Sequence, residues 1–336
     1  MSARVRKLPD AEPPFNRPLW RTLQDRGGAL GADFSFVTGS AEAQYGPTNE
    51  EPVTGEAELI ETPFEIRALE GPAPSGFTHF LDGIERSCIV GYIGVVPIVY
   101  GYVAAVVRER KGGEFGTLAV REREGFYFPF AHLAPERWTE AGLPGDALHD
   151  SEASESDAHP VRLAERGRAA VKRQRERLEA EVAGEWARAG APGWLWIDGP
   201  AHISPDVMAS GRAVGVIKSH RTHFLSAEQM RRVLVMEAAR RSSVFRPARP
   251  PVGEVHSWYV RLRSRVQRDL HFGLVRVEAA ARPETAGLAD EISRWLLGET
   301  APLALPDPRW DTVLYPIRDC EQYLRARMPT LWPDEL

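Results

Sequence analysis

Cysteine is scarce in this chain, which has two cysteines in 336 residues. Cys88 and Cys320 lie far apart in the sequence and neither belongs to a CxxC pair, so neither a disulfide framework nor a zinc site is indicated. The opening residues, MSARVRKLPDAEPPFNRP, contain no apolar run of the kind that a secretory signal has. We therefore expect a cytoplasmic protein.

Lysine is also rare, since Lys7, Lys111, Lys172 and Lys218 are the only lysines among 42 basic residues. The charge is uneven. Residues 1–160 contain 14 basic and 25 acidic residues, whereas residues 161–336 contain 28 and 22. The window 201–250, with nine basic and three acidic residues, accounts for the whole basic excess of the second half. This distribution predicts a local contact with a polyanion and excludes a uniformly basic nucleic-acid coat protein.

Nucleotide-binding and hydrolase motifs are missing as well. The chain has no Walker A sequence, no GxGxxG and no GxSxG, which excludes an obvious nucleotide-driven motor or serine hydrolase. Residues 89–107 form an uncharged run close to the length of a membrane helix. This run is rich in Val, Ile and Tyr and is interrupted by glycines and Pro97, so it predicts two buried strands turning near residues 94–97. No membrane association is expected.

Periodicity and turn residues predict a mixed α/β chain that starts with an antiparallel hairpin and has flanking helices. Residues 1–70 are interpreted as an N-terminal arm and 71–336 as the main domain, with an acidic solvated loop at about 145–159. The expected strands are 77–82 (ending at Gly83), 87–94, 98–108, 116–121, 126–130, 194–198, 213–218, 255–263 and 271–277. The expected helices are 160–189, 226–241, 284–297 and 316–327.

One short pattern occurs twice, as FLDG at residues 80–83 and WIDG at residues 196–199. Each is an apolar strand followed by Asp and Gly, and functional groups gather at strand ends in open α/β sheets. If the two strands are parallel neighbours, about 4.8 Å apart, Asp82 and Asp198 could share a divalent metal ion with hard oxygen ligands. The alternative is that Asp-Gly at these two places is ordinary turn chemistry.

Four short motifs follow one another along the chain: FLDG, WIDG, VGVIKSH at residues 214–220, and YPIRDCEQYLRA at residues 315–326. In this order they resemble the NurA nuclease family over residues 77–327. The resemblance implies an RNase H-like core related to the PIWI domain, and DNA cleavage with Mn²⁺ or Mg²⁺. It also implies a homodimer that works with the hexameric HerA translocase.

The resemblance assigns roles residue by residue. Asp82 matches the first acidic residue of the family and Asp198 the second. A third acid is expected on the helix before the second strand, where Glu181 fits best and Glu185, one turn later, is the alternate. These assignments make Asp82, Glu181 and Asp198 the expected metal ligands. Lys218 and Tyr315 match the lysine and tyrosine of the family, and either is expected to orient the phosphate.

Two positions depart from the family pattern. The first motif usually reads DGS, whereas here Ile84 follows Gly83. The late motif usually has a histidine eight residues after its tyrosine, and here that position is Tyr323. The second departure supports an alternative, a catalytically degenerate subunit that binds DNA and docks the ATPase without cutting. A metal-independent hydrolase with two carboxylates, such as a glycosidase, is a further alternative.

The expected function is therefore a metal-dependent DNA nuclease that acts with a HerA-like ATPase in DNA end processing, repair or defence. Four arginines with few acidic neighbours in the sequence are the expected DNA contacts: Arg231, Arg232, Arg240 and Arg241. The acidic arm at residues 1–70 is expected to contribute to the dimer or to the contact with the ATPase.

Overall fold

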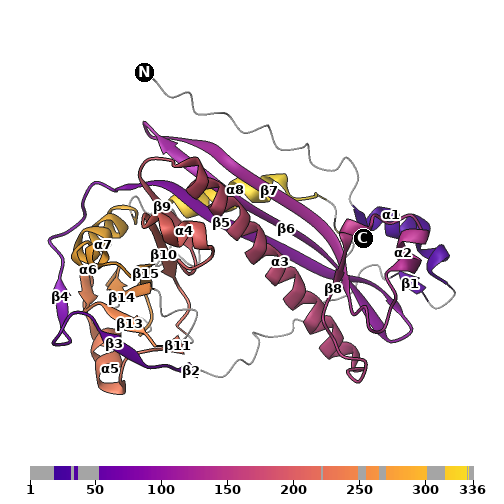
Figure 1. Ribbon diagram of the computed structural model, residues 1–336, viewed down its shortest axis with the longest axis horizontal. Coiled ribbons are helices and arrows are strands. Elements are labelled where there is room, and N and C mark those ends of the chain that lie inside the picture. The colour runs from indigo at the N-terminus through magenta and orange to yellow at the C-terminus, as the bar shows by residue number, and fades with distance from the viewer. Residues whose placement is uncertain are drawn as a thin grey trace.

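Three long antiparallel strands cross the middle of the molecule (Figure 1). They are β5 (Phe77–Ile93), β6 (Val96–Lys111) and β7 (Glu114–Phe128). The computed structural model describes residues 19–31, 34–36, 53–220, 222–248, 255–264, 270–300, 315–330 and 332. The β5–β6 hairpin turns at Gly94 and Val95, which confirms the interpretation of residues 89–107 as paired strands. No helix among the described residues is both long and apolar enough to cross a bilayer.

The strands extend further than the sequence predicts. Residues 77–82 and 87–94 are one continuous strand, so β5 does not end at Gly83. Residues 116–121 and 126–130 likewise belong to one strand, β7, which ends at Phe128. The reason is that both segments pair along their length with β6, and cross-strand hydrogen bonds outweigh the preference of glycine or charged residues for turns.

The sheet is mixed and flanked by helices, as predicted. Its central order is β7-β6-β5-β9-β10, in which β9 (Trp194–Asp198) is parallel to β5 and β10 (Ala213–Ile217) is parallel to β9. The chain reaches β9 from β7 through the long helix α3 (Pro160–Ala189). The antiparallel pair β14 (Val255–Arg261) and β15 (Leu274–Ala280) extends the sheet beyond β10.

Short strands complete the two edges of the sheet. The edge strands and the separate pair are β1 (Phe34–Phe36), β2 (Val53–Thr54), β3 (Ala57–Leu59), β4 (Ile66–Ala68), β8 (Leu148–Asp150), β11 (Thr222–His223), β12 (Arg240–Ser242) and β13 (Phe245–Pro247). β8 pairs with β7, so the segment expected as a solvated acidic loop contributes a strand, and Ser151 and Ala153 after it are buried.

Helices cover both faces of the sheet. The helices other than α3 are α1 (Leu19–Arg26), α2 (Glu136–Glu140), α4 (Pro205–Ser210), α5 (Ala227–Val235), α6 (Pro283–Gly287), α7 (Ala289–Gly298) and α8 (Tyr315–Arg327). One core packs α1, α2, α7 and α8 against the sheet, and the other packs α3 and α4 against the opposite face. Figure 1 shows α3 running diagonally across the long strands.

The sequence explains where the main helices begin and end. Pro160 occupies the first turn of α3, and Gly190 ends that helix in the left-handed conformation with a φ of 61°. Ser226 caps α5 through a capping box with Gln229, as its position predicts. α5 ends at Val235 rather than near residue 241, because residues 240–242 form β12 between β14 and β4.

Strands on both sides of the predicted domain boundary at residue 70 belong to the same sheet. β3 pairs with β13 and β4 pairs with β12, so residues 57–68 are joined to the lobe that contains β14. At the other end, Trp20 and Leu23 of α1 are buried in the core that contains the hairpin. The rest of the expected arm, residues 1–18, 32–33 and 37–52, lies outside the described residues.

Candidate active site

The two Asp-Gly motifs meet because β5 and β9 are parallel neighbours. Leu81 and Ile197 are the last paired residues of the two strands, so Asp82 and Asp198 follow at the same level. β9 ends at Asp198, whereas β5 continues for eleven more residues, from Asp82 to Ile93. Asp198 therefore lies at a strand end, as predicted, and Asp82 lies in the middle of a long strand beside that end.

Asp82 is a buried carboxylate, with 9% of its surface exposed. Its Oδ1 accepts a hydrogen bond of 2.8 Å from the backbone N–H of Gly83. Burial raises the pKa of Asp82 well above its usual value, and the negative charges of Asp198 and Glu179 raise it further. The Lys218 ammonium and the Gly83 hydrogen bond oppose this shift without cancelling it. A cation bound beside Asp82 would therefore stabilise the ionised form of its carboxyl group.

Lys218 lies directly after β10 and contacts the second carboxylate. Its Nζ donates to Oδ2 of Asp198 over 2.8 Å, and both side chains are partly exposed. β10 brings it there because Val216 pairs with Asp198, so the residue two positions later emerges beside the end of β9. The structure thus brings together Asp82, Asp198 and Lys218, three of the residues that the sequence selects.

The helix carboxylate at this site is Glu179, which the sequence reasoning missed. Glu179 is 7% exposed, and its Oε1 lies against the backbone of Gly83, where the Cβ of any larger residue would overlap it. Burial raises the pKa of Glu179 to about 7; the contact with Arg175 counteracts the shift, while the charges of Glu176 and Asp198 add to it. A glycine inside a strand often marks such a close approach, and Gly83 was the available signal.

Glu181 and Glu185, the expected helix ligands, turn toward β7 instead. Glu181 is bound by Arg123 with Nη2–Oε distances of 3.1 Å, and Glu185 is bound by Arg121 at 2.6 Å. The carboxylate of Glu181 is also 41% exposed. The structure therefore does not bring either residue to Asp82 and Asp198, because the phase of α3 points position 179 at β5 and position 181 away from it.

The helix α8 closes the sheet beneath Asp82. Cys320 is fully buried, and its Sγ donates to the backbone carbonyl of Phe80 over 3.4 Å. Burial raises the pKa of Cys320, and the nearby charge of Asp82 adds to the shift. Tyr315 is the first residue of α8 and is half-buried. Tyr323, at the position of the expected histidine, packs its ring against Arg108 and Arg327, with guanidinium-to-centroid distances of 4.6 and 5.6 Å.

The four arginines expected at the DNA differ in what they contact. Arg231 is exposed, and Arg232 donates to the Phe64 carbonyl over 3.1 Å while stacking on its ring. Arg240 pairs with Glu237 at 2.9 Å and is partly exposed. The structure leaves these three near the surface.

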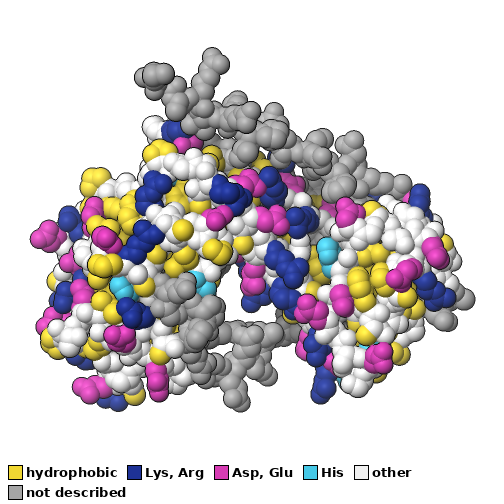
Figure 2. Space-filling view, viewed as in Figure 1, with side chains coloured by type: hydrophobic (Ala, Val, Ile, Leu, Met, Phe, Trp, Pro, Cys, Tyr) yellow, Lys and Arg dark blue, Asp and Glu magenta, His cyan; other side chains and the backbone are white. Residues whose placement is uncertain are grey.

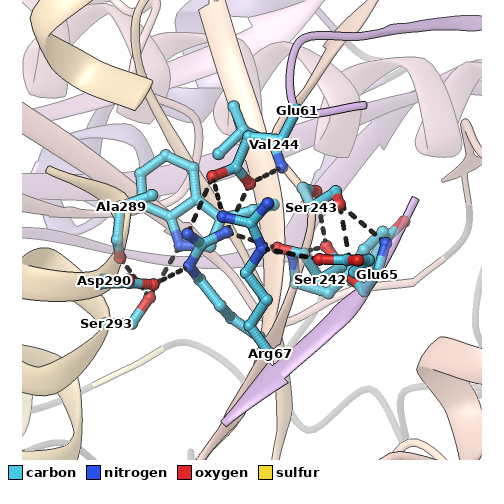
Figure 3. A network of polar contacts seen from close by, with 12 residues as sticks. Glu61, Glu65, Arg67, Ser242, Ser243, Val244, Ala289, Asp290 and Ser293 are labelled. Carbon is cyan, nitrogen blue, oxygen red and sulfur yellow. Dashed lines mark hydrogen bonds and ion pairs between the residues drawn. The ribbon is translucent and has the colours of Figure 1, made fainter. Parts of the chain in front are cut away.

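Arg241, by contrast, cannot meet a polyanion, because its side chain is only 2% exposed. Its guanidinium donates to Glu61 and to Asp290, two carboxylates of the polar network in Figure 3. Glu61 also accepts from the backbone N–H of Val244 over 2.7 Å, so this network ties the segment before β4 to β12 and α7. The prediction that Arg241 contacts DNA is therefore wrong, because its charge is paired with Glu61 and Asp290 inside the protein.

The donor set at the site suits a hard divalent cation, since three carboxylates provide only oxygen ligands. Among the described residues, however, no three Asp, Glu, His or Cys side chains already stand at metal-ligand spacing. The pairings explain why: Asp198 is drawn onto Lys218 and Glu179 onto Arg175. The residues fit a Mg²⁺ or Mn²⁺ ion in chemistry, and side-chain rotation is needed to assemble the ligands.

Comparison with known proteins gives a similarity at the level of structure and none at the level of sequence. No family model matches the chain, and no curated protein matches its sequence. Among solved structures, the chain is similar to the NurA nuclease from Sulfolobus solfataricus, with a TM-score of 0.43 and 13% sequence identity. The match covers 76% of this chain and 82% of that chain. This similarity is too low to assign the chain to a family.

Proposed function

We propose that this chain is a metal-dependent nuclease that hydrolyses phosphodiester bonds in DNA. The observation that carries the proposal is the arrangement beside the end of β9, where the charges of Asp82, Asp198 and Glu179 act on one another and Lys218 pairs with Asp198. Two of these carboxylates are buried and have raised pKa values, which is common where a protein is built to receive a cation or a proton.

In this proposal Asp82, Asp198 and Glu179 would hold Mn²⁺ or Mg²⁺. When bound, the ion would stabilise the charge that develops on the phosphate oxygens during hydrolysis. Lys218 is placed to bind a phosphate oxygen once Asp198 turns to the ion, because its ammonium already lies 2.8 Å from that carboxylate. Tyr315 remains a second candidate for orienting the phosphate.

The nucleic-acid substrate is supported by the charge of the second half of the chain and by its surface. Figure 2 shows a hollow in the middle of the molecule, and Lys and Arg side chains gather beside it over α3. Several exposed basic residues lie on that helix, among them Arg162, Lys172 and Arg177. Phosphate contacts of this kind supply most of the affinity for a nucleic acid backbone.

We further propose that the chain forms a two-fold dimer and works with a HerA-like hexameric ATPase. Its role would be in DNA end processing or defence. These parts of the proposal rest on the sequence motifs that resemble NurA. Light scattering of the full-length protein, alone and with such an ATPase, tests them, and a monomer that binds no ATPase would remove this part.

A degenerate subunit that binds DNA without cutting is a second candidate. It is favoured by the position of Tyr323, whose ring is packed against two arginines and cannot replace an imidazole ligand. Labelled single- and double-stranded DNA incubated with Mn²⁺, Mg²⁺ or EDTA separates the candidates. The proposal expects cleavage that EDTA abolishes, whereas binding without cleavage in either metal would establish the degenerate subunit.

A further inference from the structure

The structure provides an internal cation for the helix carboxylate of the site. Arg175 lies one turn before Glu179 on α3, and its Nη1 donates to Oε1 of Glu179. The side chain of Arg175 is 20% exposed, so it is mostly buried but still reaches solvent. Glu179 is thereby neutralised within the chain, as Asp198 is by Lys218.

Arg175 has a second, separate anchor on the strand that carries Asp82. Its Nε donates to Oε2 of Glu85 over 3.1 Å. Glu85 is two residues from Gly83 on β5, so both face the same side of the sheet, toward α3. The guanidinium therefore uses its Nε edge for Glu85 and its Nη1 for Glu179, and the two contacts can be broken independently.

Resting on the function proposed above, we propose that Arg175 is an exchangeable cation that later binds the substrate. It neutralises Glu179 until a divalent ion binds. When Glu179 turns to that ion, Nη1 of Arg175 loses its partner and, with the neighbouring Nη2, binds a phosphate group of the DNA. Glu85 keeps the Nε edge in place throughout.

The exchange has a physical basis in burial. A buried carboxylate such as Glu179 is costly without a positive partner, so the protein needs a cation there before the metal arrives. Once the metal supplies that charge, the guanidinium loses its partner. Phosphate is the natural replacement, because the planar guanidinium matches it with two parallel N–H···O bonds.

The chain contains a matched control in Arg123. This residue also pairs with a glutamate of α3, Glu181, at 3.1 Å, but its side chain is 44% exposed and the pair lies on the β7 side of the helix. Loss of Arg123 removes an Arg–Glu pair of the same type from the same helix and does not release Glu179. It is outside the proposed site.

The first arm of the test measures Mn²⁺ affinity by isothermal titration calorimetry on the full-length protein without DNA. It is run at about pH 8.5, because loss of Arg175 also removes a contact that opposes the raised pKa of Glu179, and fewer protons compete for the carboxylate at higher pH. Arg175→Gln removes the competing cation, and loss of a charge-assisted contact predicts about tenfold tighter binding of Mn²⁺. Arg123→Gln should stay within about twofold of the wild type, since an exposed pair contributes little. Thermal unfolding of each variant checks that the fold is retained.

The second arm measures DNA cleavage with saturating Mn²⁺. Arg175→Gln should raise KM for DNA by about tenfold or more through loss of a charged phosphate contact. Arg175→Lys restores the charge but not the two-edged geometry, so its Mn²⁺ affinity should return toward the wild type while its KM stays high. Arg123→Gln should change neither quantity by more than about twofold.

The outcomes separate this inference from the proposed function. Mn²⁺ binding by the wild type with the same affinity in Arg175→Gln, or an unchanged KM in that variant, overturns the role of Arg175 and leaves the nuclease proposal standing. Absence of Mn²⁺ binding in the wild type and in every variant overturns the metal site itself, and the exchange with it.

Discussion

The substitution Glu179→Gln should stabilise the folded protein at neutral and alkaline pH. Folding raises the pKa of this carboxyl from 4.5 to about 7, because the side chain is buried. Each pKa unit corresponds to about 1.4 kcal/mol, so keeping Glu179 charged costs the native state about 3 kcal/mol well above pH 7. Glutamine removes the charge and retains an oxygen that accepts from Arg175.

The pH dependence has a definite sign. A group whose pKa is raised on folding binds more protons in the native state than in the unfolded state between the two pKa values. The contribution of Glu179 to the free energy of unfolding of the wild type is therefore most favourable below about pH 4.5, and it declines as the pH rises through about 7. The advantage of Glu179→Gln should be near zero below about pH 4.5 and approach about 3 kcal/mol at about pH 8.

Urea unfolding in EDTA, followed by tryptophan fluorescence at about pH 5 and about pH 8, measures this difference. Glu181→Gln is the control, because that side chain is 41% exposed and should show a change of about 0.5 kcal/mol or less at either pH. The reasoning is refuted if Glu179→Gln is no more stable than the wild type at about pH 8, or if Glu181→Gln gains as much.

Three further substitutions probe the site and the lobe beside it. Asp198→Asn should reduce Mn²⁺-dependent cleavage at least about 100-fold with a normal circular dichroism spectrum, since it removes a proposed ligand at a strand end; full activity would contradict the assignment. Gly83→Ala should displace Glu179 and lower the midpoint of thermal unfolding, at a cost of about 1–3 kcal/mol for overpacking. Arg241→Ala should destabilise the protein by about 3 kcal/mol in urea unfolding, because Glu61 and Asp290 lose the buried guanidinium and Glu61 keeps only Arg67 as an ion-pair partner; a loss under about 1 kcal/mol would make this network dispensable.

The sequence located the strand acids because their signal is local. Asp82 and Asp198 each follow an apolar strand segment, and parallel pairing of β5 with β9 brought them to one level as predicted. The extent of the strands was not predictable in the same way. Gly83 suggested a strand end, whereas the cross-strand pairs with β6 continue through it, and these pairs depend on residues far along the chain.

The spacing of the family motifs does not identify the helix acid, because the direction of a side chain on α3 depends on the helical phase. Glu179 is four residues before Ala183 and seven before Trp186, both buried, so it belongs to the stripe of α3 that faces the sheet. Glu181 lies off that stripe. A glutamate within an apolar stripe is the signal that the sequence offered, and the pairing of Glu181 with Arg123 required the register of β7, which the sequence does not reveal.

Cleavage rates of Glu179→Gln and Glu181→Gln, measured side by side on the same labelled DNA with Mn²⁺, test the central claim most directly. The two residues lie two positions apart on one helix, but only Glu179 reaches Gly83 beside Asp82. We expect Glu179→Gln to lose at least about 100-fold in rate and Glu181→Gln to stay within about threefold of the wild type. The reverse ranking, or equal rates in both variants, would contradict the site described here.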